Sequence, residues 1–421
     1  MTTQLLTPAS ADRTGRARER RRPTLPPVPA YVLAAAIVGL GLFASVTPSP
    51  LYSIYRSAWD LSPLTLTLVY ATYAIGVLLA LLITGSASDR FGRRPVLLVA
   101  VAGLIAASVL SALAPGVVWL VVARAVQGVA TGLALSTAGA ALLELHPRRD
   151  AAAAGLANTA ASTAGIALGV LVASLLVEFD WAPRLLPYLA QLVLLVIAAV
   201  GVMALPETVG RRDAIRWRIR RPSIPAAVRR PFTVAALTVT ASWSLGGLLF
   251  SLGPALGARL FDTTDAIVSS AAIVAQAATA TVSQVVFRRL PPRQAAAAGS
   301  AALAIGVVLI AHAAATGSGA GFLIGAAVSG LGFGTGFLGG LRLLTRAIPA
   351  GDRAAVMAAF YLVAYLALSV PAVLAGSLVG AFGLQVTFQV IAAPIAVLAL
   401  VTAAVAILRR PSGAASEAGA A

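Results

Sequence analysis

The chain of 421 residues contains no cysteine and no lysine, and only 11% of its residues are charged. Without cysteine, neither a disulfide framework nor a thiolate metal site can form. The two histidines, His146 and His312, lie far apart in the sequence, which argues against a protein-built zinc site, and we expect no cofactor. Soluble domains average about a quarter charged residues, so this chain has too little polar surface to coat a water-facing globule. The composition therefore argues against a soluble enzyme.

Hydrophobic residues make up 59% of the chain, and the mean hydropathy is +0.92. A bilayer core of about 30 Å needs about 20 consecutive apolar residues per helix. The long apolar runs lack the strict alternation of a membrane β-barrel, so we predict an all-α membrane protein. Stretches bounded by charge, proline or glycine predict twelve spans: 31–55, 63–86, 95–114, 117–143, 151–176, 184–204, 232–257, 266–287, 294–314, 319–345, 354–380 and 383–408.

The arginines indicate the orientation of these spans. With the N-terminus in the cytoplasm, 27 of the 31 arginines fall in cytoplasmic segments, whereas Arg56, Arg184 and Arg259 fall outside and Arg124 lies within a span. Such a bias predicts a multi-pass protein of the cell inner membrane with both termini cytoplasmic. The net charge of +17 is then explained by topology and by contact with anionic lipid headgroups at the cytoplasmic face. No loop is long enough for a basic folded domain, so we expect no nucleic-acid partner.

The longest interior hydrophilic stretch divides the spans into two sets of six. We predict a disordered cytoplasmic tail over 1–30, a six-helix bundle over 31–205, a cytoplasmic linker over 206–231, a second six-helix bundle over 232–410 and a tail over 411–421. Shifting the second half back by 202 positions aligns Val126 with Val328, Gly128 with Gly330, Gly132 with Gly334, Pro147 with Pro349 and Asp150 with Asp352. Parallel repeats of this kind suit alternating access, in which two bundles rock about a site between them.

A charged motif stands between the second and third spans. It contains Gly85, Asp89, Arg90, Gly92, Arg93 and Arg94. The glycines permit close packing, while the carboxylate and the guanidinium groups can pair with each other or with helix ends. We therefore predict a latch at the cytoplasmic ends of the helices.

With this motif the chain resembles the major facilitator superfamily, in the branch that includes bacterial drug-efflux proteins. The resemblance covers twelve spans, the two halves, the central loop and the Pro206-Glu207-Thr208 end of the sixth span. It implies two pseudo-symmetric six-helix bundles and a small-molecule substrate. The glycine-proline pair expected within the fifth span of drug and proton antiporters is absent, because Val170 follows Gly169.

The fourth span resembles a second signature of the family and carries Arg124, Gln127 and Thr131 on one helical face. A guanidinium near a helix centre costs at least about 2.5 kcal/mol in lipid, so Arg124 is expected to point inward. Contact with the substrate or with a proton relay is one interpretation, and a structural bond to carbonyl groups of the first span is the other. Ala326 occupies the repeat-related position, so only one bundle carries this charge.

Polar and aromatic residues at helical spacing mark further candidate cavity positions. We expect a mostly neutral, amphipathic cavity, with a kink at Pro48 near the outer end of the first span. No acid lies at the centre of a span, so the group that would titrate is not identified. The candidate positions are Ser49, Tyr52, Tyr70, Tyr73, Asn158, Ser162, Trp243, Gln276, Tyr361 and Tyr365.

The sequence favours a secondary transporter, acting as a monomer, that exports lipophilic or weakly anionic compounds in exchange for protons. Proton-linked uptake of a small metabolite is an alternative. A sensor or scaffold without transport is another, although the only hydrophilic segments long enough to pass a signal are rich in Arg and Pro or in Ala and Gly. We find no convergent nucleophile, base or metal set, so we do not expect an enzyme.

Overall fold

The computed structural model describes residues 24–84, 87–179, 182–209, 222–349 and 351–408. In these ranges the chain forms helices and no strand. The predicted motif residue Gly85 lies outside them, as do most of both predicted tails and much of the predicted linker. The helices are α1 (Pro27–Val46), α2 (Tyr52–Trp59), α3 (Pro63–Thr84), α4 (Ala87–Phe91), α5 (Arg93–Ala112), α6 (Val117–Leu145), α7 (Ala151–Glu178), α8 (Leu186–Met203), α9 (Arg229–Leu260), α10 (Ala266–Val286), α11 (Pro292–Thr316), α12 (Gly319–Ala347) and α13 (Arg353–Leu408), with the 3-10 helix η1 (Ala226–Val228) before α9.

Eleven of the described helices are long and apolar enough to cross a membrane. The last of them, α13, contains 56 residues and is interrupted at Gly383, whose φ of 76° and ψ of 166° are not helical. Glycine tolerates this positive φ because it has no Cβ. The break divides α13 into two spans at the boundary expected from the sequence, which gives the twelve predicted crossings.

The first span differs from its predicted bounds of 31–55. Helix α1 ends at Val46, residues 47–51 form turns, and the short helix α2 follows. Pro48 and Pro50 lack the backbone N–H that would continue the helix, so they end the span instead of kinking it. Hydropathy alone extended the span because Leu51 and Tyr52 are apolar, and both are indeed buried.

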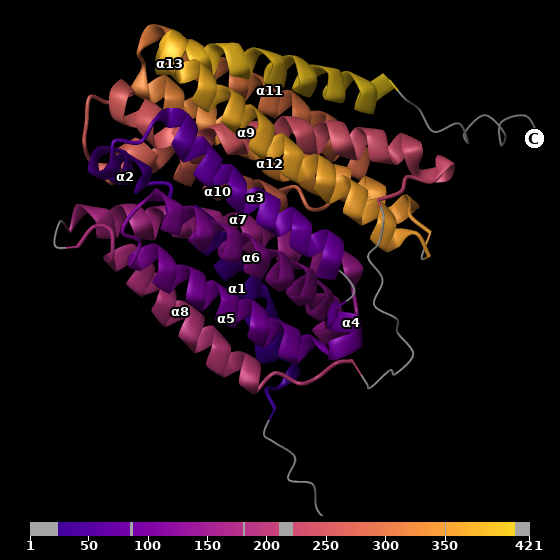
Figure 1. The fold of residues 1–421 in the computed structure, drawn as a ribbon. Helices are drawn as coiled ribbons and strands as arrows, with labels where there is room; N and C mark the ends of the chain where they lie inside the picture. The colour runs from indigo at the N-terminus through magenta and orange to yellow at the C-terminus, as the bar shows by residue number, and fades with distance from the viewer. Residues whose placement is uncertain (1–23, 85–86, 180–181, 210–221, 350, 409–421) are drawn as a thin grey trace, which may run out of the picture.

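The helices form two groups that lie side by side (Figure 1). In the first group α6 packs against α1, α3 and α5, while α7 covers α1 and α8 covers α5. In the second group α9 and α11 both pack against α13, and α12 packs against α9, α10 and α11. The main contacts between the groups are those of α7 with α10 and of α3 with α13.

The sequence repeat corresponds to a repeated helix contact. A methyl group on Gly128 would clash with the Tyr73 carbonyl of α3, and one on Gly330 would clash with the Gln276 carbonyl of α10. The repeat-related glycines therefore allow α6 to approach α3 as closely as α12 approaches α10. Close backbone approach through small residues is a common way to pack helices in membranes, where lipid is as apolar as leucine.

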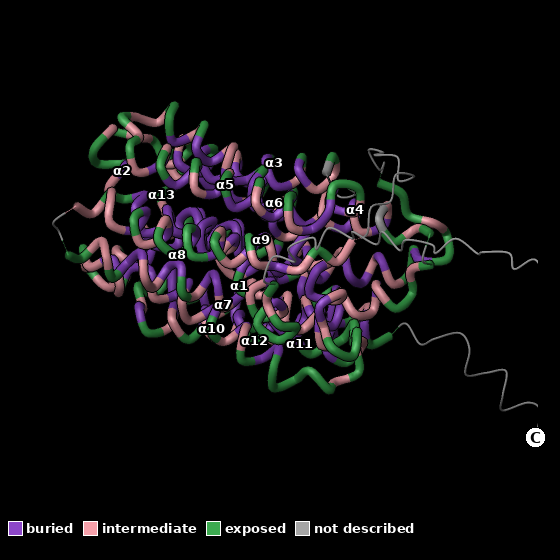
Figure 2. Tube along the Cα trace, turned by 90° about the horizontal axis from the view of Figure 1, so that it is seen from below, coloured by how far each residue is buried: buried purple, intermediate pink, exposed green. Residues whose placement is uncertain are grey.

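Buried residues follow the middle of the assembly, and exposed residues lie on its outer surfaces and ends (Figure 2). One hydrophobic cluster contains residues of both groups, among them Leu51 and Val69 with Leu248 and Leu252. Two other clusters each belong to one group: Ala34 and Leu142 lie in the first of these and Phe232 and Val356 in the second. The two groups therefore share a core at the end near α2 and have separate cores at the other end.

We call that other end the arginine-rich end, since it holds residues 87–94, 146–149, 346–349 and 351–353. The end near α2 is called the opposite end.

Candidate functional site

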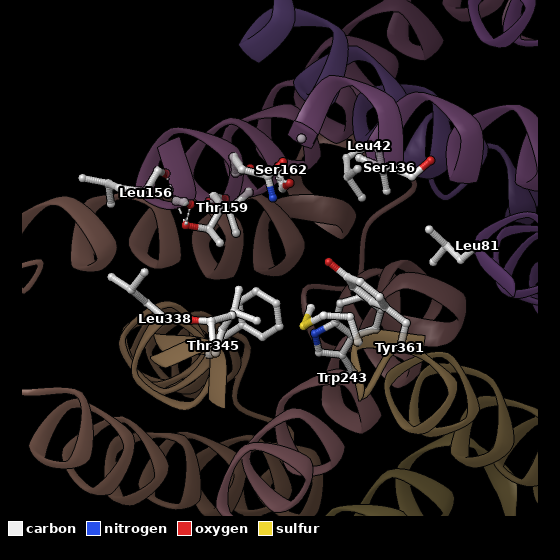
Figure 3. A pocket seen from close by; sticks show the side chains of 18 of the residues that line it. Leu42, Leu81, Ser136, Leu156, Thr159, Ser162, Trp243, Leu338, Thr345 and Tyr361 are labelled. Carbon is white, nitrogen blue, oxygen red and sulfur yellow. Dashed lines mark hydrogen bonds between the residues drawn. The ribbon is translucent and has the colours of Figure 1, made fainter. Parts of the chain in front are cut away.

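A cavity of about 800 Å³ lies between the two helix groups and reaches the arginine-rich end. Leu156 and Ser162 of α7 face Trp243 of α9 and Leu338 of α12 across it (Figure 3). Its position follows from the packing, because the cores of the two groups are separate on this side of the molecule. A cavity of this size can hold a drug-sized molecule.

The second helix group supplies an aromatic wall. The ring centroids of Trp243 and Tyr365 are 5.1 Å apart and the rings meet edge to face at 86°. Phe337 lies 6.1 Å from Trp243, and Phe333 of the same helix stacks on Phe337 at 6.3 Å. Tyr361 also lines the cavity. These rings offer a broad apolar surface to an aromatic or lipophilic molecule.

The first helix group supplies polar atoms on α7. Ser162 donates a hydrogen bond to the Asn158 carbonyl at 2.8 Å, so that hydroxyl is satisfied within its own helix. The Asn158 Oδ1, and the Trp243 Nε1 of α9 in the second group, are buried and have no hydrogen-bond partner among the described residues. Because unpartnered polar groups are rare in protein interiors, these two atoms are available to bind a polar group of a solute.

Seven of the thirteen predicted coupling or cavity residues lie in the cavity lining. The structure brings together Tyr70, Tyr73, Asn158, Ser162, Trp243, Tyr361 and Tyr365. The other six are buried outside this lining: Ser49, Tyr52, Arg124, Gln127, Thr131 and Gln276. Gln276, for example, donates to Ser329 Oγ at 3.3 Å inside the second group.

Arg124 is fully buried between α1, α3 and α6. Its Nη1 donates to the Ser45 carbonyl at 2.8 Å and to Gln127 Oε1 at 2.7 Å, and Gln127 in turn donates to the Ala44 carbonyl at 2.7 Å. The guanidinium carbon lies 4.5 Å from the ring centroid of Tyr73. The arginine therefore points inward and binds a carbonyl of the first span.

The predicted latch residues form a charge cluster at the arginine-rich end. The Arg93 guanidinium is 2.6 Å from Asp89 and 2.7 Å from Glu144 of α6, and it also donates to Ser88 at 2.5 Å. Its Nε reaches the second oxygen of Glu144 at 3.2 Å, so the pair with Glu144 is bidentate. Arg90 lies instead over the ring of Phe91, at 5.3 Å from its centroid. In the part of the chain that the structure describes, both ion pairs belong to the first helix group.

Glu207 caps the helix that follows this motif, a role that the sequence did not reveal. Its carboxylate accepts hydrogen bonds from the backbone N–H groups of Arg93 at 2.8 Å and Arg94 at 3.1 Å. Gly92 precedes them with a φ of 94°, and a side chain there would meet the Glu207 carboxylate. A carboxylate at a helix N-terminus is stabilised by the unpaired N–H groups and by the helix dipole. The next residue, Thr208, donates to Glu144 and so joins the cap to the charge cluster.

The charged side chains in the cavity lining are predominantly basic. Arg342, Arg346 and Arg353 line it from the second group, and Arg93 and Glu144 from the first. Because Glu144 is the single carboxylate of the described lining and is paired with Arg93, the arginines of the second group dominate the local field. Arginines around a concave entrance attract anions and raise their local concentration.

The opposite end is closed by contacts between and within the groups. The shared core contains Tyr55 and Tyr188, whose hydroxyls are 3.0 Å apart. Glu178, at the end of α7, accepts a hydrogen bond from the backbone N–H of Ala266, the first residue of α10. Within the described residues, these contacts join helices at the opposite end, whereas the cavity reaches the arginine-rich end.

Comparison with known proteins agrees with this architecture. The profile of the Major Facilitator Superfamily matches residues 31–370. The chain belongs to the Major Facilitator Superfamily. Its fold also resembles that of the human organic anion transporter MFSD10, with a TM-score of 0.65 and 16% identity over 91% of this chain and all of that one. Members of this family are membrane transporters, and the helices of this chain that are long and apolar enough to cross a membrane agree with that membership.

Relatives with assigned roles are bacterial transporters. A triacylglyceride transporter of Mycobacteroides abscessus is 38% identical over 25% of this chain and 21% of its own length. The multidrug efflux pump LfrA of Mycolicibacterium smegmatis is 31% identical over 45% of this chain and 37% of its own. These two alignments thus cover well under half of either relative. The class C tetracycline resistance protein of Escherichia coli is 28% identical over 66% of this chain and 70% of its own.

Proposed function

We propose that this transporter exports a lipophilic or weakly anionic compound by alternating access and that proton entry drives the export. The observation that carries the proposal is the cavity between two separately packed helix groups, which reaches one end and is closed at the other. Rocking of the groups about the α7–α10 and α3–α13 contacts would close the arginine-rich end and open the opposite one. The predicted domain limits, with bundles at 31–205 and 232–410, fit this movement.

The proposed direction depends on the orientation in the membrane. Arginine-rich loops remain in the cytoplasm, so we place the arginine-rich end and both termini on the cytoplasmic side of a bacterial inner membrane. The cavity then faces the cytoplasm, where an export substrate is collected. Relatives named as a multidrug efflux pump and a tetracycline resistance protein support this direction.

Transport against a gradient requires a coupled ion, and we propose the proton. Glu144 is the one carboxylate of the described cavity lining, and its partner Arg93 is buried. Protonation of Glu144 would remove one charge from the cluster that joins α5, α6 and the segment after α8. We therefore assign the coupling proton to this cluster.

Transport in proteoliposomes with an imposed pH gradient tests the proposal. Vesicles containing the full chain are loaded with a panel of compounds that includes tetracycline and ethidium, and the movement of each is followed with and without a protonophore. We expect the gradient to drive at least one lipophilic compound against its concentration, and the protonophore to abolish the movement. Movement in the same direction as the protons would indicate uptake, while failure of every compound to respond to the gradient would refute proton-driven export.

The orientation can be tested separately because the natural chain has no cysteine. Ser223→Cys and Ser57→Cys each place a thiol at an exposed position, before α9 and on α2 respectively. In intact cells, an impermeant maleimide should label only the Ser57→Cys protein. Labelling of Ser223→Cys from outside would reverse the proposed orientation.

A further inference from the structure

The Arg124 guanidinium is a buried cation with incomplete hydrogen bonding. Within the part of the chain that the structure describes, all of its hydrogen bonds are made through Nη1, whereas Nε and Nη2 are buried and have no partner there. The Nε and Nη2 hydrogens project from one edge of the planar group, and this edge matches the two oxygens of a carboxylate. The free edge is therefore suited to bidentate recognition of an anion.

Unpartnered hydroxyl groups accompany this free edge. The Tyr73 hydroxyl interacts with the Ser45 and Thr131 side chains, but neither it nor Thr131 Oγ1 forms a hydrogen bond of normal geometry with any described residue. Tyr52, which is likewise buried with a free hydroxyl, lies within electrostatic reach of Arg124. Buried polar groups are rarely left unpaired in folded proteins. Several donors without acceptors around one cation are explained together if a ligand supplies the acceptors.

Tyr73 is the nearer of two cavity-lining tyrosines that contact this cation, since the Tyr70 ring centroid lies 5.8 Å from the guanidinium carbon. Tyr73 and Ser45 line the cavity and Arg124 does not, yet Arg124 lies 4.5 Å from the Tyr73 ring centroid and bonds to the Ser45 carbonyl. The ring stabilises the guanidinium by a cation–π interaction, which is weaker than a bidentate bond to a carboxylate. An anion in the cavity could thus replace the ring as the partner of Arg124 once the ring turns aside.

The surroundings indicate what kind of anion would fit. Tyr365, within electrostatic reach of Tyr73, begins the aromatic wall that continues to Trp243 and Phe337. At the cavity entrance, Arg342 and Arg346 would attract negative charge. A lipophilic body against the wall would leave a carboxylate directed toward Tyr73.

We propose that Arg124 is a concealed carboxylate-binding site for lipophilic aromatic acids, with Tyr73 as the side chain that covers it. The acid enters along the basic lining, its ring packs on the wall formed by Trp243 and Tyr365, and its carboxylate displaces the Tyr73 ring to bind Nε and Nη2. This proposal rests on the proposed transport function and defines the substrate class for it.

Equilibrium binding to the full chain in lipid nanodiscs tests the site. The probes are 1-naphthoate and 1-naphthamide, which share the ring system and differ in charge. Because hydrogen bonds to a charged partner are stronger than hydrogen bonds between neutral groups, we expect the wild-type protein to bind naphthoate at least about tenfold more tightly than naphthamide. In Arg124→Gln the preference should fall to about threefold or less while naphthamide binding is retained. Arg56→Gln removes an equal charge from an exposed position on α2, so this variant should keep the wild-type preference.

A second variant decides the matter if Arg124→Gln does not fold. Tyr73→Leu removes the covering ring and leaves Arg124 in place, so the preference for naphthoate should rise severalfold. Equal binding of the two probes by the wild-type protein, an undiminished preference in folded Arg124→Gln, or an unchanged preference in Tyr73→Leu would each overturn the proposal. These assays measure binding without a gradient. A preference for the carboxylate in the absence of proton-driven movement would therefore refute the proposed export but not the proposed binding site.

Discussion

In the charge cluster of Asp89, Arg93 and Glu144, we predict that the two carboxylates paired with one arginine contribute unequally to stability and to transport. Both acids contact the Arg93 guanidinium, at 2.6 and 2.7 Å. They differ in geometry and exposure: the Asp89 side chain is 45% exposed and Glu144 33%, and Glu144 alone is bidentate and also accepts from Thr208. Neutralising each acid in turn, as Asp89→Asn and Glu144→Gln, should therefore have unequal effects.

The expected magnitudes follow from these environments. An exposed ion pair contributes about 0.2–1 kcal/mol, so Asp89→Asn should lower the free energy of unfolding by about 0.5 kcal/mol. Breaking a fully buried pair costs about 3–5 kcal/mol, and we reduce this to about 2 kcal/mol for Glu144→Gln because Glu144 is one-third exposed. In the double variant Arg93 loses both charged partners, so the combined cost should exceed the sum of the single costs by about 1 kcal/mol.

Unfolding of the purified protein in mixed micelles, titrated with a denaturing detergent, measures these differences. Transport is then measured in proteoliposomes that contain equal amounts of folded protein. We expect Asp89→Asn to reduce transport severalfold despite its small effect on stability. The reason is that a latch at the moving end influences the conformational change more than it influences the stability of the core. If Asp89→Asn destabilises the fold as much as Glu144→Gln, the assignment of the main structural bond to Glu144 is wrong. If the two costs are simply additive, the coupling of the two acids through Arg93 is refuted.

Three further predictions concern helix contacts. Gly165→Ala, whose methyl group would clash with the Gly39 carbonyl of α1, should destabilise the protein by about 2 kcal/mol, whereas Gly155→Ala, in open space on the same helix, should be neutral or slightly stabilising in thermal unfolding. The backbone N–H groups of Ala152 and Ala153 hold the pKa of the Asp150 carboxyl below its ordinary value. This carboxylate cap therefore stabilises the start of α7 fully at pH values above the ordinary pKa, and the stabilisation is lost as the pH falls through the lowered pKa. Asp150→Ala should speed amide exchange in the first turn of α7 at pH 7, and an unchanged rate would contradict the cap. Glu178→Gln weakens the contact of α7 with α10, so the population of molecules open at the opposite end should change by about two- to fivefold, as measured by spin-label distances across that end. An unchanged population would show that this contact does not hold the opposite end closed.

The fold was largely predictable because lipid makes strong demands on a sequence. Every span must bury its backbone polar groups in a helix about 20 residues long, so hydropathy and the positions of charges located the twelve crossings. The error at the first span arose where this signal fails. Leu51 is as apolar as a membrane residue, but it follows Pro50, directly precedes α2 and packs into the core shared by the two helix groups.

The site was less predictable because it depends on contacts between distant segments. The pattern on α6 indicated that Arg124 points inward, but it could not show that the cavity-lining Tyr73 contacts the arginine. Phe333 and Phe337 were missed as lining residues, although their i and i+4 spacing on a glycine-rich span was a usable signal. Glu178 carried no local signal at all, since its partner on α10 is 88 positions away.

The two halves share a way of packing but not their chemistry, and this difference has a consequence for transport. The repeated glycines Gly128 and Gly330 let each half bring two of its helices equally close. Arg124, however, has Ala326 as its counterpart, so one half holds the deep charge while the other presents the aromatic wall. A solute that is both charged and aromatic must then contact both halves simultaneously. If the proposed site is correct, such a solute binds more strongly when the two halves approach each other than when they are apart, and differential binding of this kind is what allows a ligand to shift a conformational equilibrium.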